Sequence, residues 1–351
     1  MSNLLHYLQY AVEKQASDLF IIAGGSISAK IDGQIQPVEE RRLLPPETEQ
    51  LITEIYTLAS RPMEKYLRTN DDDFSFSVPS LARFRVNTYR QRNSMAAVVR
   101  VVSFDIPNWQ DIHIIPQVMD IANITNGLIL FTGTAGSGKS TTQACIIDHI
   151  NKTRACHIVT LEDPIEYLHR NRKSIISQRE VAIDTADYLS ALRACLRQAP
   201  DVILLGEMRD AETIRTAITA AETGHTVIAT MHTKGAVNAI DRVIDSFPAE
   251  LQGQIRFQLA TVLRTVVSQQ MMPDKDGNVI PAFEIMHVNN AIRSMIRDNR
   301  NYQIEQAITA GKNDGMVTMD ASIAALYRSG IITKETALGY ADHPDLLQKH
   351  L

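Results

Sequence analysis

The segment GTAGSGKS at residues 133–140 constrains this chain most, because it matches the pattern G-x-x-x-x-G-K-[S/T] at all of its positions. The apolar run GLILFT before it has the length of a buried strand, and TTQACIIDHI after it has helical spacing. Its glycines let backbone N–H groups approach phosphate oxygens, and the start of a helix adds a favourable dipole. The segment therefore predicts a nucleotide phosphate site in an α/β domain.

The residues of this loop have distinct expected roles. Lys139 is expected to neutralise the β- and γ-phosphates of ATP, and Ser140 to offer its hydroxyl to Mg²⁺. ATP and Mg²⁺ are therefore the expected cofactors. The nucleotide-binding residues predicted in the loop are Gly133, Thr134, Ala135, Gly136, Ser137, Gly138, Lys139, Ser140 and Thr141.

The rest of the chain divides into two regions of different pattern. In residues 1–103, DFSFSV, RFRVNTYRQ and MAAVVRVVS alternate polar and apolar residues, which predicts an α+β domain whose antiparallel sheet has one covered face. The two prolines of FDIPNWQDIHIIP predict a linker over residues 104–116. In residues 117–351, CHIVTLED, DVILLGE and TVIATMHT predict further strands of a parallel sheet, followed by a hairpin turning at Asp276-Gly277 and C-terminal helices.

Two groups of carboxylates end predicted strands. In a nucleotide hydrolase, a strand such as DVILL usually ends in an aspartate that helps to hold the metal, but here Gly206 fills that place and Glu207 follows. A second group, Glu162 and Asp163, closes the run HIVTLED just before Pro164. Ligands of open α/β sheets bind at the carboxyl ends of the strands, so we expect Glu162 and Glu207 to share the metal and water chemistry.

Two histidines, His225 and His232, bracket the run TVIATM. A strand rises about 3.3 Å per residue, which places His232 at the ligand-binding edge and His225 near the opposite end, so the two are not expected to share a metal. His232 is a candidate to contact the γ-phosphate. A structural role is the ordinary alternative for either histidine.

Five arginines and no acidic residue lie between positions 81 and 100. Alternation along a strand predicts that Arg83 and Arg85 share one face and that Arg90 and Arg92 share one face. Three interpretations remain open: a solvated face near the acidic residues 71–73, a nucleic-acid surface, or arginines that reach a nucleotide on the other domain or a neighbouring subunit.

Charge and composition exclude some classes of function. The formal net charge of −5 argues against a protein that mainly coats nucleic acid, so no nucleic-acid partner is expected. The three cysteines form no CxxC pair, which argues against a zinc ribbon and a disulfide framework. No segment approaches the roughly 18 uninterrupted apolar residues of a membrane span, so direct membrane insertion is not expected.

Four motifs in this order resemble the secretion and pilus traffic ATPases, and most closely the retraction branch of the type IV pilus motors. They are GTAGSGKST, TLEDPIEYLH, APDVILLGEMRD and TGHTVIATMHT. AIRSMIR, residues 291–297, resembles a segment of the retraction branch, whereas assembly ATPases typically carry a four-cysteine motif that this chain lacks. The alternatives are a pilus-assembly or type II secretion ATPase, a RecA-type DNA motor and a non-catalytic nucleotide switch.

The resemblance implies a PAS-like N-terminal domain joined to a RecA-like ATPase domain. It further implies a cytoplasmic homohexamer at the inner face of the cytoplasmic membrane, acting on an integral inner-membrane platform protein to retract a pilus. Carried over by position, Glu162 would activate water and Glu207 would be the carboxylate on the metal side. The other residues that the resemblance brings to the nucleotide are Asp163, His225, His232, Arg83, Arg85 and Arg90.

Overall fold

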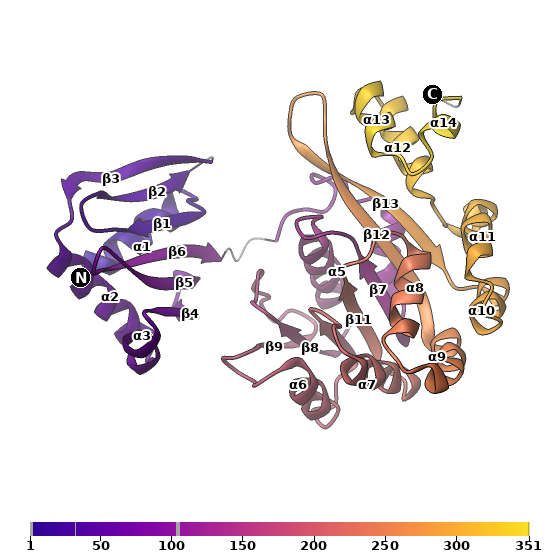
Figure 1. Cartoon of the computed structure of the whole chain (residues 1–351), viewed down its shortest axis with the longest axis horizontal. Coiled ribbons are helices and arrows are strands. Elements are labelled where there is room, and N and C mark those ends of the chain that lie inside the picture. The colour runs from indigo at the N-terminus through magenta and orange to yellow at the C-terminus, as the bar shows by residue number, and fades with distance from the viewer. Residues whose placement is uncertain (1–2, 32, 103–105, 350) are drawn as a thin grey trace. The chain divides into compact units, whose positions relative to one another are not determined.

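The computed structural model describes residues 3–31, 33–102, 106–349 and 351. The chain divides into an N-terminal unit of residues 1–105 with 166–168, and a C-terminal unit of residues 106–165 with 169–351 (Figure 1). Residues 104 and 105 of the predicted linker lie outside the described residues. Its remainder belongs to the C-terminal unit, where Ile114 is buried.

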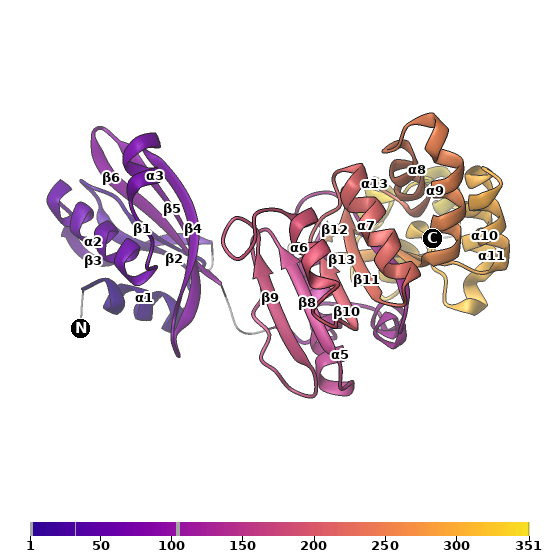
Figure 2. The same cartoon turned by 90° about the horizontal axis from the view of Figure 1, so that it is seen from below.

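The N-terminal unit is an antiparallel sheet of six strands in the order β3-β2-β1-β6-β5-β4. Its strands are β1 (Asp18–Ile21), β2 (Ser26–Ile31), β3 (Gln34–Arg42), β4 (Asp71–Val78), β5 (Ala82–Gln91) and β6 (Ser94–Val102). The helices are α1 (Asn3–Glu13), α2 (Pro45–Leu58) and α3 (Glu64–Thr69). They bury Leu8, Ile52 and Tyr66 against the apolar face of the strands, as the alternation of residues predicts (Figure 2).

Strand β5 shows how the arginines are distributed. Phe84 and Val86 point into the core, whereas Arg83 and Arg85 alternate with them and face the other side of the sheet. Arg90 has the parity of the core positions, and the strand ends at Gln91. The predicted shared face of Arg90 and Arg92 is therefore wrong, because Arg92 already lies in the turn with a φ of 46°.

The C-terminal unit is built on a sheet of seven strands in the order β13-β12-β7-β11-β10-β8-β9. Its strands are β7 (Gly127–Thr132), β8 (His157–Glu162), β9 (Ile175–Glu180), β10 (Val202–Leu205), β11 (Thr226–Met231), β12 (Leu263–Pro273) and β13 (Val279–His287). All neighbours pair in parallel except β12 and β13, which form an antiparallel hairpin. The predicted α/β class is confirmed, and the predicted hairpin also joins the main sheet as its edge.

Helices cover both faces of this sheet, which explains why its inner strands are almost wholly apolar. The helices that carry its layers are α4 (Pro116–Met119), α5 (Lys139–Thr153), α6 (Tyr188–Cys195), α7 (Ala211–Glu222), α8 (Ala236–Asp245), α9 (Ala249–Val262), α10 (Asn290–Arg297) and α11 (Ile304–Ala310). Helices α4 and α5 pack on one face, and α6 to α11 contribute to the core on the other.

The far end of the β12–β13 hairpin carries a small helical cluster. Its helices are α12 (Met319–Arg328), α13 (Lys334–Tyr340) and α14 (Pro344–Leu347). Met272 and Ile280 of the hairpin pack against Ile323 of α12 in a separate apolar core. The hairpin therefore connects the main sheet with the C-terminal helices (Figure 1).

Candidate nucleotide-binding site

The predicted phosphate loop connects the end of β7 to the start of α5. Gly133, Gly136 and Gly138 have positive φ values of 145°, 77° and 79°, a region that favours glycine. At Gly133 a side chain is also excluded by space, because its Cβ would collide with the backbone carbonyl of Gln269. The loop therefore requires the glycines that its motif contains.

Lys139 is folded against the loop that precedes it. Its Nζ donates to the carbonyl oxygens of Gly133 at 2.8 Å and Thr134 at 2.7 Å, and only 6% of the residue is exposed. Ser137, within the loop itself, is buried, and its Oγ lies 3.4 Å from the same Nζ. The loop thus combines a buried ammonium with a helix N-terminus, which suits an anionic phosphate group.

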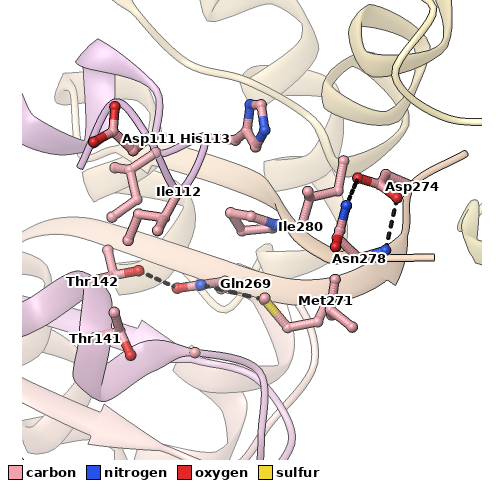
Figure 3. Close-up of a pocket in the computed structure, with 14 residues that line it drawn as sticks. Asp111, Ile112, His113, Thr141, Thr142, Gln269, Met271, Asp274, Asn278 and Ile280 are labelled. Atoms are coloured by element: carbon pink, nitrogen blue, oxygen red, sulfur yellow. Dashed lines mark hydrogen bonds between the residues drawn. The ribbon is translucent and has the colours of Figure 1, made fainter. Parts of the chain in front are cut away.

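A side-chain hydrogen bond ties the loop helix to the neighbouring hairpin. Thr142 of α5 donates from Oγ1 to Oε1 of Gln269 on β12 at 2.9 Å, and both residues are buried (Figure 3). A Cβ on Gly138 would approach the Nε2 of Gln269 to 2.9 Å. Gln269 therefore lies directly against the loop, although nothing in the sequence pattern marks it.

A pocket of about 320 Å³ lies beside the loop (Figure 3). Gly138 and Thr141 form its loop side, and Met271 and Ile280 of the hairpin form another wall. The segment around Ile112 completes it. The pocket is thus continuous with the phosphate loop and has a partly apolar lining.

Glu207 and His232 lie at the carboxyl ends of β10 and β11, as predicted, and the structure also brings them into contact with each other. The Nε2 of His232 lies 3.1 Å from Oε1 of Glu207, and the Nη2 of Arg209 lies 2.7 Å from Oε2. The Glu207 side chain is only 13% exposed, so both contacts shield a carboxylate that is nearly buried. Sequence reasoning missed Arg209, although it stands two positions after Glu207 in the same motif.

Glu162 ends β8 and is held by its neighbours. Its Oε1 accepts a hydrogen bond from Oγ1 of Thr160 at 2.6 Å and another from Nε2 of Gln178 at 3.2 Å. Asp163 follows as an exposed residue, and its contact with a nucleotide stays a prediction.

Tyr188, the first residue of α6, lies close enough to both groups of carboxylates to be affected by their charges. Burial raises the pKa of its phenol, and the charges of Asp163, Glu207 and Glu162 raise this pKa further. A Cβ on Gly206 would lie 2.8 Å from the Tyr188 hydroxyl, 3.1 Å from the carbonyl oxygen of Leu161 and 3.4 Å from the Cα of Glu162. Tyr188 and β8 therefore occupy the space that an aspartate side chain at position 206 would need.

His225 lies at the other end of β11. In the parallel pairing of β7 with β11, Gly127 faces Thr226 and Thr132 faces Met231, so His225 lies at the edge of the sheet opposite the phosphate loop. Its Nδ1 lies 2.9 Å from the carbonyl oxygen of Ala220, near the end of α7. His225 therefore cannot contact a nucleotide bound at the phosphate loop of its own chain, and that part of the prediction is wrong.

The arginines of the N-terminal unit remain predicted contacts. Arg83 lies beside Ser77, with Nη1 3.4 Å from Oγ, and Arg85 pairs across strands with Arg100. Arg90 is exposed near the end of β5. Their contact with a nucleotide, in this chain or in a neighbouring subunit, stays a prediction.

Comparison with known proteins identifies the family. The pattern of the family described as Type II/IV secretion system protein matches residues 2–314. The chain belongs to this family. The resemblance that the four motifs indicate is thereby confirmed, and the phosphate loop, both groups of carboxylates and His232 all lie within the matched residues.

Individual members of the Type II/IV secretion system family resemble the chain over nearly its whole length. The Type IV pilus retraction ATPase PilT of Pseudomonas aeruginosa is 40% identical over 98% of this chain and 99% of its own length. A Twitching motility protein of Neisseria gonorrhoeae is 38% identical over 95% of this chain and 89% of its own. The crystal structure of the pilus retraction motor PilT with bound ADP superposes with a TM-score of 0.90 at 40% identity, covering 99% of both chains.

The residues at the loop fit a nucleotide with a magnesium ion. Ser140 is exposed at the start of α5, and Glu207 supplies a carboxylate, so both offer the oxygen ligands that Mg²⁺ prefers. The described residues contain no group of three or more histidine, cysteine or acidic side chains that could hold a metal by themselves. This donor set suits an ion bound mainly through nucleotide phosphates. Among the described helices, none is long and apolar enough to cross a membrane.

Proposed function

We propose that this protein is an ATPase that powers the retraction of type IV pili. The observation that carries the proposal is the gathering of Glu207 and His232, with Glu162 on the next strand, at the sheet edge where the phosphate loop begins. The near-complete match to a pilus retraction ATPase supports the direction of the motor. Mg-ATP is the proposed substrate complex.

In the proposed mechanism the phosphate loop binds and orients the triphosphate. Backbone N–H groups of the loop and the Lys139 ammonium neutralise the phosphate oxygens. Ser140 and Glu207 would hold Mg²⁺, which when bound neutralises charge that develops on the phosphates. Because Arg209 and His232 already contact Glu207, they orient its carboxylate toward this task.

Glu162 is the proposed residue that accepts a proton from the attacking water. Its carboxylate is fixed by Thr160 and lies at the end of β8, next to the strand that leads to Glu207. His232 is proposed to contact the γ-phosphate as well as Glu207, so that it links the nucleotide to this carboxylate. The pocket beside Gly138 and Thr141 is the proposed site of the ribose and base.

The proposed motor works as a homohexamer at the inner face of the cytoplasmic membrane, on an integral platform protein. Arg83, Arg85 and Arg90 are proposed to reach the nucleotide from the N-terminal unit, within the chain or across a subunit boundary. Closure of the two units on ATP and reopening after hydrolysis would supply the displacement.

Steady-state release of phosphate from ATP tests the enzymatic part of the proposal. Glu162→Gln keeps the size of the side chain but removes the base, so kcat should fall by roughly 100-fold or more while nucleotide binding persists. The control is Glu212→Gln, which alters an exposed surface ion pair with Arg193 and should leave kcat unchanged.

Three other outcomes would contradict specific parts of the proposal. If Glu162→Gln kept wild-type turnover while Glu207→Gln lost it, the two carboxylates would have exchanged roles. Turnover that rises steeply when DNA is added would favour a DNA motor. ATP binding with no turnover in the wild-type protein would indicate a nucleotide switch.

A further inference from the structure

Gln178 lies on the sheet strand next to Glu162. In the parallel pairing of β8 with β9, Gln178 faces Thr160, and Glu162 follows Thr160 by two positions. Side chains two residues apart on a strand point to the same face. Gln178, Thr160 and Glu162 therefore lie together on one face of the sheet, close to its carboxyl edge.

Two hydrogen bonds of the Gln178 amide indicate its orientation. Its Oε1 accepts from the backbone N–H of His169 at 2.8 Å, and its Nε2 donates to Oε1 of Glu162 at 3.2 Å. The flipped amide would place NH₂ against an N–H donor and a carbonyl oxygen against a carboxylate, so both contacts would become repulsive. The backbone of His169 thus forces the donor side of Gln178 toward Glu162.

Glu162 is in this way held from two strands. Thr160 donates to Oε1 of Glu162 at 2.6 Å from β8 itself, and Gln178 donates to the same oxygen from β9. A glutamate has three side-chain torsions, and two donors on one oxygen restrict them to a single arrangement. A base that is held in one arrangement loses less entropy when the attacking water is aligned.

We propose that Gln178 is a positioning residue that aims the Glu162 carboxylate at the attacking water. This inference rests on the proposed role of Glu162 as the base. Gln178 does not contact the water itself: the backbone N–H of His169 fixes its amide, and the amide in turn holds Glu162. Position 178 lies outside the four motifs quoted in the sequence analysis.

Two substitutions separate this role from general support of the fold. Gln178→Glu keeps the shape and an acceptor for the His169 N–H, but the carboxylate cannot donate to Glu162 when both are ionised. Gln178→Met keeps the length and removes both hydrogen bonds. Because each variant loses a hydrogen bond to a charged group, kcat should fall by about tenfold or more.

The measurements are kcat, KM for ATP and the affinity for a fluorescent ADP analogue, together with the thermal midpoint. The inference predicts a lower kcat with KM for ATP and ADP affinity close to wild type in both variants, whereas loss of the acceptor for the His169 N–H lowers the thermal midpoint of Gln178→Met. Gln198→Glu, an exposed residue of the same type beyond α6, is the control for the added charge and should behave as wild type.

The double variant Glu162→Gln with Gln178→Glu is the most selective test. It restores a donor and an acceptor with their places exchanged, so its single-turnover rate constant for hydrolysis should equal that of Glu162→Gln alone. If the two losses multiply, Gln178 supports the fold and the inference is wrong. It is equally wrong if both Gln178 variants keep wild-type kcat while Glu162→Gln is inactive. Full activity of Glu162→Gln would instead overturn the proposed base, and the inference with it.

Discussion

The crowding at Gly206 makes Gly206→Ala a sensitive test of the site geometry. The added methyl would lie 2.8 Å from the Tyr188 hydroxyl and 3.1 Å from the carbonyl oxygen of Leu161. Real Cβ atoms essentially never approach another heavy atom to less than 3.0 Å, so Tyr188 must move. Because the Leu161 oxygen belongs to the backbone of β8, relief of the second contact requires a backbone shift at position 206 or in the strand that carries Glu162.

The expected cost follows from overpacking of a buried site. Added methyl groups in well-packed interiors cost about 1–3 kcal/mol. For a domain of this size, each kcal/mol lowers the melting temperature by about 2–4 °C, so the midpoint should fall by about 2–12 °C. ATP turnover should fall as well, since the Cα of Glu162 lies 3.4 Å from the added atom.

The assay is thermal unfolding with parallel ATPase measurements. Gly253→Ala is the matched control, because an added Cβ in α9 meets nothing within 4 Å and alanine favours a helix. Tyr188→Phe removes the closest atom and should restore part of the stability of Gly206→Ala. An unchanged midpoint and turnover in Gly206→Ala would refute the explanation for the missing aspartate.

Three further substitutions test other contacts. Lys139→Met should abolish ATP binding, as measured by calorimetry, because the loop loses its buried ammonium. Thr142→Val leaves the buried Oε1 of Gln269 without this donor, so urea unfolding should show a loss of about 1–3 kcal/mol. Burial lowers the pKa of His169 to about 4, below its ordinary value of 6.5. The unfolded chain therefore binds more protons between these values, and stability should fall by about 2 kcal/mol between pH 7.5 and 5. Urea unfolding of His169→Gln, which cannot titrate, should show that much less acid sensitivity.

The parts of the fold that the sequence predicts are those specified by local pattern. The run GLILFT and the glycines of residues 133–138 combine strand length, positive φ and a helix start within a short segment, and all of these are found. The alternation around Phe84 likewise identifies the covered face of the N-terminal sheet. Such features depend on neighbours in sequence, so a single chain is enough to recognise them.

The parts that were missed or mistaken depend on partners distant in sequence. Gln269 reaches the phosphate loop only because β12 joins the sheet next to β7, and no periodicity indicates that register. Gln178 lies on a strand too polar to be recognised as part of a buried sheet. Arg92 was assigned to a strand because its composition continues the pattern, but the turn begins there.

The central claim is that this ATPase retracts pili, and counting surface pili tests it most directly. A deletion strain of the source organism would be complemented with the wild-type protein or with Glu162→Gln, and pili would be counted together with twitching movement. Deletion and Glu162→Gln are both expected to leave an excess of pili that do not retract, and the wild-type protein is expected to restore movement. Loss of surface pili in the deletion strain would contradict the account and indicate an assembly motor.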